Sequence, residues 1–158
     1  MAYTTIDDPS KYFQTTIYTG TGSNLSVTNG GNSDLQPDWV WVKDRDAVSD
    51  HKLTDSNRLA SGKPSITLES NTDTAEFNDA DPMSTDSFDT DGFTIGTNGN
   101  YNTDDNTYVA FQWKCNSGTT VTVAESGNNP ANVRQTNTDA GFSIITYTGT
   151  GAVGTIAH

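Results

Sequence analysis

Three aspartates in one short segment could together bind a metal ion. Asp86, Asp89 and Asp91 lie within residues 85–92, and carboxylate oxygens are the hard ligands that calcium binds. The segment has no glutamate at the closing position of an EF-hand loop, and Asp-Gly before a strand is ordinary turn chemistry. We therefore expect a solvated turn here. A calcium site is the less favoured alternative, and no other cofactor is predicted.

Catalytic groups form no recognisable motif. His51 lies near Asp50 and Asp55, but the chain contains neither a Gly-x-Ser-x-Gly nucleophile elbow nor a His-Glu-x-x-His zinc motif. A glycosidase would need a pair of carboxylates on an inner strand face, and no spacing aligns Glu69 with Glu76 in this way. We expect that the protein is not an enzyme, and we assign no catalytic residue.

The three tryptophans are the remaining candidates for a binding site. Trp39, Trp41 and Trp113 could stack on sugar rings if they are exposed. Each lies in a run of residues that reads as a strand, where aromatic side chains belong more often to the core. We expect at least two of the three to pack between sheets, and we keep carbohydrate binding as the alternative.

Charge and composition exclude several classes of protein. Only eight lysines and arginines occur against a net charge of −12, and they form no cluster. Such a chain does not neutralise a nucleic-acid backbone and is repelled by an anionic membrane surface. No apolar run approaches the roughly 20 residues that span a bilayer. We expect no nucleic-acid partner and no membrane insertion.

The N-terminal residues 1–11 read as a polar arm. They have no basic start and no apolar stretch, so they do not resemble a secretory signal peptide. Cys115 is the single cysteine, so no internal disulfide is possible. We expect synthesis in the cytoplasm of the producing cell. We also expect Tyr3, Ile6 and Tyr12 to dock the arm on a neighbouring chain, by adding a strand or wrapping a surface.

Alternating apolar and polar residues predict an all-β fold. Hydrophobic residues make up only 32% of the chain, a composition that favours disorder at this charge, but the aromatic residues gather in short alternating runs, as half-buried strands require. The two strongest are 37–43 and 107–114; weaker strands are expected at 13–18, 24–28, 51–55, 65–69, 75–77, 93–96, 119–123 and 142–147. We predict an antiparallel β-sandwich over residues 12–125, an exposed loop over 70–91 and a linker over 126–141.

An internal repeat is the most informative feature of the sequence. Residues 13–22 (FQTTIYTGTG) recur as residues 142–151 (FSIITYTGTG), and the run Tyr-Thr-Gly-Thr-Gly is identical. Repeats of such long period indicate duplicated domains. We favour the interpretation that residues 142–158 begin a second repeat, which leaves the sequence cut shortly after that start. The alternative is that they form the final strand of a pseudo-symmetric sandwich.

A series of motifs carries a family resemblance. They occur in the order YTGTG (18–22), PDWVWVK (37–43), HKLTDSNR (51–58), SFDTDGFTIG (87–96) and YVAFQWK (108–114). This series resembles a repeat domain of virion proteins from marine tailed phages. That domain is similar to concanavalin-type (laminin-G or SPRY-like) jelly-roll sandwiches and often occurs in tandem. The match covers about residues 13–115 and restarts at 142.

The resemblance implies a structural component of a bacteriophage virion, made in the host cytoplasm. We expect an appendage protein, such as a tail fibre or tail-associated protein. A capsid decoration protein is one alternative. A lectin-like module that recognises host-surface glycans is the other. Other virion proteins and further copies of the chain are the expected partners.

Overall fold

A computed structural model describes residues 6–78 and 85–158, and in these residues the fold is all-β. Strand pairing is antiparallel throughout the described sheets, as predicted. None of the described helices is long and apolar enough to cross a membrane. The elements in chain order are η1 (Pro9–Lys11), β1 (Phe13–Thr19), β2 (Leu25–Val27), β3 (Trp39–Asp44), β4 (Lys52–Asp55), β5 (Ile66–Glu69), β6 (Phe77–Asn78), β7 (Thr85–Asp89), β8 (Gly92–Ile95), α1 (Gly99–Asn102), β9 (Thr107–Trp113), β10 (Val121–Val123), β11 (Asn132–Asn137) and β12 (Phe142–Tyr147).

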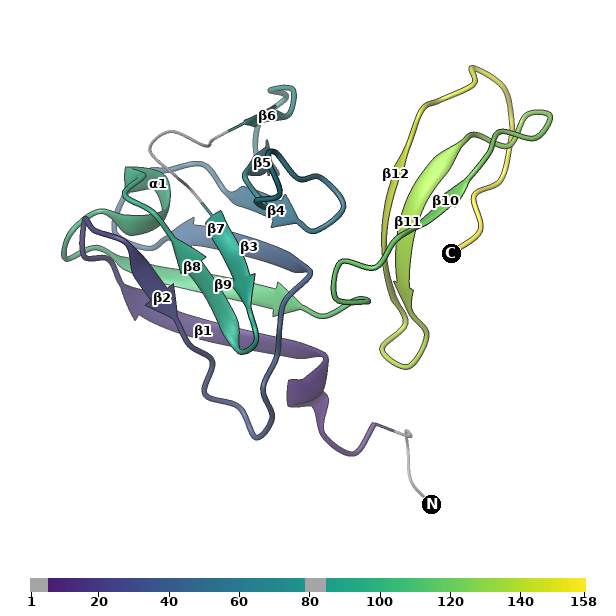
Figure 1. The fold of residues 1–158 in the computed structure, drawn as a ribbon. Coiled ribbons are helices and arrows are strands. Elements are labelled where there is room, and N and C mark those ends of the chain that lie inside the picture. Colours follow the sequence, from purple (N-terminus) through teal and green to yellow (C-terminus); the bar gives the residue numbers. More distant parts are fainter. Residues whose placement is uncertain (1–5, 79–84) are drawn as a thin grey trace.

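The described strands form three sheets. A large sheet has the order β1-β9-β3-β4-β5-β6, and a small sheet with the order β2-β8-β7 covers one of its faces. These two sheets make the predicted sandwich. The third sheet, β10-β11-β12, stands beside the sandwich in Figure 1 and belongs to neither of its layers. We call this third sheet the C-terminal hairpin sheet.

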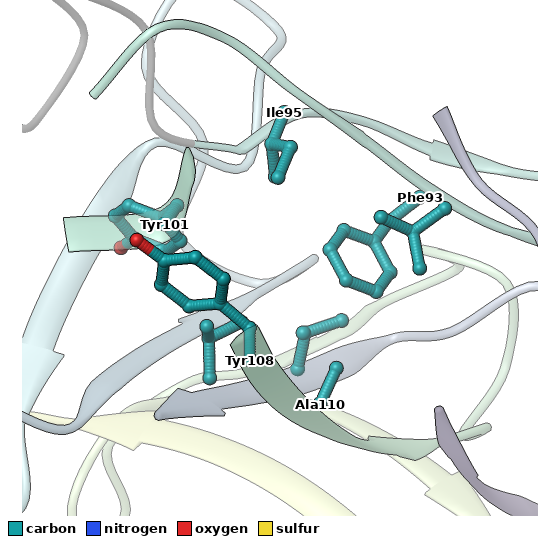
Figure 2. Packing of buried hydrophobic residues seen from close by; sticks show 8 residues of the cluster. Phe93, Ile95, Tyr101, Tyr108 and Ala110 are labelled. Carbon is teal, nitrogen blue, oxygen red and sulfur yellow. The ribbon is translucent and has the colours of Figure 1, made fainter. Parts of the chain in front are cut away.

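The hydrophobic core lies between the large and the small sheet (Figure 2). Strands β3 and β9 supply it from one side and β2 and β8 from the other, because alternate residues of each strand point inward. The short helix α1 closes one end with Tyr101. The buried members of the core are Val27, Val40, Val42, Phe93, Ile95, Tyr101, Tyr108 and Ala110.

Polar side chains extend this core. Gln112 is fully buried, and its amide donates hydrogen bonds to Asn29 Oδ1 at 2.5 Å and to Thr16 Oγ1 at 3.1 Å. Buried polar groups are tolerated when their hydrogen bonds are satisfied. This packing of amides and hydroxyls explains how a chain with few hydrophobic residues still fills a sandwich.

The expectation that most tryptophans pack within the sandwich is wrong. Val40 and Val42 point into the core, so Trp39 and Trp41 point to the opposite, outer face of the large sheet. Trp113 likewise lies on the face of β9 opposite to Gln112. Both faces of these strands are apolar, and alternation alone does not tell which face is inside.

Several expected boundaries also differ from the structure. The expected linker 126–141 contains β11, the central strand of the C-terminal hairpin sheet, and β10 belongs to this sheet rather than to the sandwich. Strand β12 joins the same sheet, so it is not a final strand of either sandwich layer. The expected loop 70–91, of which residues 79–84 lie outside the described residues, contains β6 close to the short strand expected at 75–77, and also β7, which was not expected. Strand β11 has the sequence NVRQTN, which lacks the apolar alternation that would reveal it.

Candidate functional site

The outer face of the large sheet carries a continuous group of apolar side chains, several of them exposed. Its side chains come from β1, β9, β3, β4 and β5, and cross-strand pairing aligns them in rows: Phe13, Trp113 and Trp39 in one, and Phe111, Trp41, Leu53 and Leu68 in the next. Ile17 and Val109 follow in a third row. Ile17 is 64% exposed. We call this surface the aromatic face.

Aromatic rings of neighbouring strands contact one another along the aromatic face. The ring centroids of Trp39 and Trp113 are 4.6 Å apart, and Phe13 lies 4.8 Å from Trp113. Farther along the same strands, Trp41 contacts Phe111 at 5.7 Å. Trp41 Nε1 also donates a hydrogen bond to His51 Nδ1 at 3.1 Å, so this histidine orients a ring. The contacts hold the aromatic side chains in fixed positions.

The C-terminal hairpin sheet covers one end of the aromatic face. Phe142 at the start of β12 stacks on Trp39 and Trp113, with centroid distances of 5.8 and 6.1 Å. The other end, around Trp41, Phe111 and Ile17, has no such cover among the described residues. The predicted tryptophan cluster is therefore divided. Trp39 and Trp113 lie under the hairpin sheet, and Trp41 lies in the open part.

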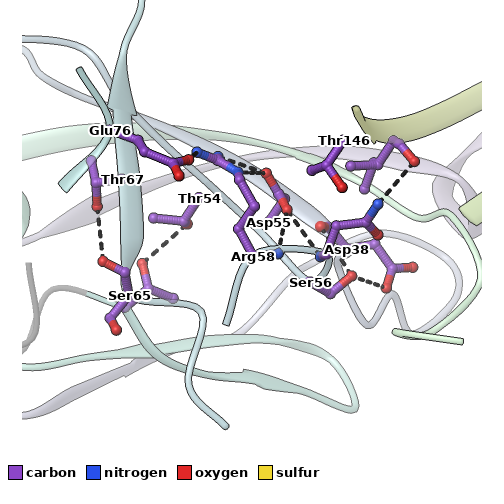
Figure 3. Close-up of polar contacts among 12 residues, drawn as sticks. Asp38, Thr54, Asp55, Ser56, Arg58, Ser65, Thr67, Glu76 and Thr146 are labelled. Atoms are coloured by element: carbon purple, nitrogen blue, oxygen red, sulfur yellow. Dashed lines mark hydrogen bonds and ion pairs between the residues drawn. The ribbon is translucent and has the colours of Figure 1, made fainter. Parts of the chain in front are cut away.

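A groove of about 550 Å³ lies between the aromatic face and β12. Apolar side chains of the large sheet face the residues of β12 across it. Its lining residues are Trp39, Leu53, Leu68, Ile144, Ile145, Thr146 and Tyr147, together with the polar residues Asp55, Asn57, Arg58 and Glu76. Arg58 is held by Asp55, with Nε to Oδ2 at 2.7 Å, and by Glu76 at 3.1 Å (Figure 3).

The N-terminal arm folds back onto its own chain. Ile6 and Tyr12, two of the predicted docking residues, line an apolar pocket of about 410 Å³. Phe13, Trp113 and Phe142 line the same pocket. Tyr3, the third predicted docking residue, lies outside the described residues. The arm residues that are described thus complete the covered end of the aromatic face.

A buried carboxylate joins the sandwich to the segment that leads into the hairpin sheet. Asp38, only 1% exposed, accepts hydrogen bonds from the backbone N–H groups of Cys115, Ser117 and Gly118 at 2.7 to 2.9 Å. It also accepts one from the Ser56 hydroxyl at 2.8 Å (Figure 3). Several donors around one carboxylate stabilise its charge without a cation.

Two amide side chains complete the connection. Gln135 of β11 is 1% exposed; its oxygen accepts from the N–H groups of residues 116 and 118, and its nitrogen donates to Ser56 and Asn57. The Asn57 amide nitrogen donates to the carbonyl oxygens of Val133 and Ile144. These bonds fix the hairpin sheet on the sandwich. Asp38, Ser56 and Asn57 lie within the PDWVWVK and HKLTDSNR motifs, whereas Gln135 lies in neither, and nothing in the spacing assigns these residues this role.

The three predicted calcium ligands have separate partners. Asp86 pairs with Lys63, and Asp89 accepts hydrogen bonds from Ser87 and Thr94. Asp91 accepts from the N–H of residue 35 at 3.1 Å. Within residues 6–78 and 85–158, no group of three or more histidine, cysteine, aspartate or glutamate side chains is placed to hold a metal ion. The carboxylates act as local hydrogen-bond acceptors.

Comparison with known proteins adds one assignment. No curated protein and no solved structure matches the chain. A family model described as a domain of unknown function (DUF7483) matches residues 8–158, which include the sandwich and the C-terminal hairpin sheet. The chain belongs to this family.

Proposed function

We propose that the protein is a structural component of a bacteriophage virion, in an appendage such as a tail fibre or a tail-associated part. The observation that carries the proposal is the open end of the aromatic face. Trp41 and Phe111 are half-buried there, and Ile17 is 64% exposed. Contiguous exposed apolar surface of this kind marks sites of protein–protein contact.

The composition of this surface fits a protein partner. Interfaces are enriched in tryptophan, phenylalanine and tyrosine at their centre and are polar at their rim. Trp41 and Phe111 form the centre here, and Lys43, Thr15 and His51 lie around them on the same strands or the next. A strand-built surface is also rigid, since hydrogen bonds to both neighbours hold β3 and β9. A rigid apolar surface suits permanent packing in a particle.

Labelling of virions tests this proposal. Antibodies raised against the isolated chain are applied to purified particles of a phage that encodes it, and gold labels are located by electron microscopy. The proposal predicts labels on a tail appendage. Labels spread over the head would support a capsid decoration protein instead. Particles that contain no copy of the chain by mass spectrometry would contradict a virion role.

A second candidate function, glycan binding, is favoured by the groove beside β12. Its volume of about 550 Å³ is in the range of small-molecule sites, which combine apolar walls with a few oriented polar groups. Trp39 and Leu53 supply apolar wall, and Arg58, Asp55 and Glu76 supply charged groups. A glycan array tests this function. Binding that is lost in Arg58→Ala and retained in Arg45→Ala, a change at an exposed site outside the groove, would support it.

A further inference from the structure

Two strands of this chain occupy equivalent places in the internal repeat but have different surroundings. Strand β1 and strand β12 begin the two copies of the internal repeat, so position 13 corresponds to 142 and position 18 to 147. Among the described strands, β1 pairs only with β9, and β12 pairs only with β11. Each is therefore the edge of its sheet. The two copies differ in what covers them.

The tyrosine of the repeat shows the difference most clearly. Tyr18 lies against the sandwich core, stacked on Tyr108 with ring centroids 5.1 Å apart, and its hydroxyl donates to the carbonyl oxygen of Tyr101 at 2.9 Å. Tyr147 is 62% exposed. A large aromatic side chain that anchors a sandwich in one copy is thus left at the surface in the other.

The first glycine of the repeat shows the same contrast. A Cβ atom added at Gly20 would lie 2.1 Å from the carbonyl oxygen of Thr103, so only glycine permits the approach of β1 to the loop before β9. At Gly149 an added Cβ would meet nothing within 4 Å. The packing that requires this glycine in the first copy is absent around the second.

The two faces of β12 have different surroundings. Phe142 stacks on the tryptophans of its own sandwich and Ile144 is buried. Alternation along the strand places Tyr147, which also lines the groove at the end of β12, on the other face. In β1 the corresponding division leaves Phe13 on the aromatic face and turns Tyr18 toward the core. The face of β12 that carries Tyr147 therefore corresponds to the core-facing side of β1.

Two further features lie on the Tyr147 face of the hairpin sheet. Asn132 pairs with Tyr147 across the strands; it is 6% exposed, and its amide oxygen has no hydrogen-bond partner among residues 6–78 and 85–158. The residues after β12 lie on the side away from the sandwich (Figure 1). Arg134, whose strand partner is Ile145, donates to the carbonyl oxygen of Ala157 there. In the first copy, β2 likewise follows β1 and lies across the core from it.

We propose that β12 is a shared strand: its free edge is the docking site for a second sandwich body, built like residues 25–113 of this chain, in which β12 takes the place of β1. The β1–β9 pairing sets the register. Phe142 would lie opposite the residue equivalent to Trp113, and Tyr147 would stack on the residue equivalent to Tyr108. Successive bodies would be joined rigidly, because one strand belongs to both. This inference holds independently of the proposed virion role.

A fused chain tests the proposal. The chain is continued after Gly151 by residues 23–158 of a second copy, so that β12 is the only first strand open to the second body. In a background of Cys115→Ala in both copies, cysteines are introduced by Thr146→Cys and by Val109→Cys in the second copy. This pair corresponds to Ile17 and Val109, which face each other across β1 and β9.

Two controls make the result decisive. The 158-residue chain with Ile17→Cys, Val109→Cys and Cys115→Ala shows whether this pair of positions can form a disulfide. A second fused chain, residues 1–141 followed by 13–158, carries the β1 sequence at the junction, with the same cysteine pair and Cys115→Ala in both copies. It shows whether a second body folds there with a strand known to fit.

The proposal predicts a disulfide between β12 and the second body in the fused chain, with a yield like that of the 158-residue control. It further predicts that Gly149→Val lowers this yield about tenfold, since a side chain there would collide with the second body as one at Gly20 would with Thr103. Absence of the disulfide while both controls form it would overturn the proposal. Failure of both fused chains to fold a second body would also overturn it, because the hairpin sheet would then leave no room for one.

Discussion

The carboxylate of Asp38 accepts a hydrogen bond of 2.7 Å from the backbone N–H of Gly118, across 80 residues of sequence. Gly118 has a positive φ of 74° and lies in the segment that leads from β9 into the hairpin sheet. The same carboxylate binds the N–H groups of Cys115 and Ser117. One buried side chain thus determines how the chain leaves the sandwich.

Asp38→Asn is expected to destabilise the protein by about 3 kcal/mol. The amide would present an N–H₂ group to backbone donors, and hydrogen bonds to a charged group contribute about 1.5–3 kcal/mol each. Urea unfolding followed by tryptophan fluorescence measures the change. Asp34→Asn, at an exposed aspartate, is the matched control and is expected to change the free energy of unfolding by less than about 0.5 kcal/mol. Equal effects of the two variants would contradict the role assigned to Asp38.

Gln135→Leu is expected to loosen the hairpin sheet while leaving the sandwich folded. The change removes the acceptor of the Asn116 N–H group and one of the two acceptors of the Gly118 N–H group, together with the hydrogen bonds to Ser56 and Asn57, at a cost of about 2 kcal/mol. Hydrogen exchange measured by mass spectrometry should become faster over residues 115–147 and stay unchanged over β8 and β9. Thr122→Val, at an exposed position of β10, provides the control. Uniformly faster exchange in the whole chain would show that the hairpin sheet is not a separate unit.

Gly20→Ala and Gly149→Ala change equivalent positions of the two repeat copies, and only Gly20→Ala is expected to lower the stability of the protein strongly. Gly20→Ala should cost about 2–3 kcal/mol, because the new Cβ collides with a backbone carbonyl that cannot move freely. Gly149→Ala has open space and should change the free energy of unfolding by less than about 1 kcal/mol. Thermal unfolding of both variants checks this difference. A large loss of stability in Gly149→Ala would mean that the second copy is already packed in this chain.

Cys115 gives a pH-dependent prediction. Burial raises the pKa of its thiol from 9.0 to about 11, and the thiol is 5% exposed. At pH 8 the folded chain should therefore react with a thiol reagent about a hundredfold more slowly than the urea-unfolded chain, since only the thiolate reacts. A labelling rate that does not change on unfolding would contradict the burial of this thiol.

The raised pKa of Cys115 also makes the free energy of unfolding depend on pH. The folded pKa lies above the unfolded one, so the contribution of Cys115 is fully present below pH 9 and is lost as the pH rises toward 11. The free energy of unfolding should fall over this window. The fall should be smaller in Cys115→Ala, where the raised pKa values of Tyr18 and Tyr108 still contribute.

The fold class could be predicted because strand alternation is a local property. The runs at 37–43 and 107–114 form β3 and β9, in which buried and half-buried residues alternate. Alternation does not identify the inner face when both faces are apolar. For this reason at least two of the three tryptophans were expected between the sandwich sheets, whereas all three point to the outer face of the large sheet.

The polar parts of the molecule were harder to predict. Strand β11 has no apolar alternation, and its central residue Gln135 is buried only because four partners from distant segments surround it. Asp38 is likewise buried among hydrogen-bond donors from distant segments. A buried polar residue is specified by its tertiary hydrogen bonds, which leave no mark in the local sequence.

Oxidative footprinting tests the central claim, that the open aromatic face packs against a neighbour in the virion. Hydroxyl-radical oxidation of Trp41 and Phe111 is compared between the free chain and intact phage particles. Leu59, 48% exposed in the turn region after β4, serves as the reference side chain. The account predicts that Trp41 and Phe111 are protected in the particle relative to Leu59. Oxidation of Trp41 and Phe111 to the same extent in both samples would contradict it.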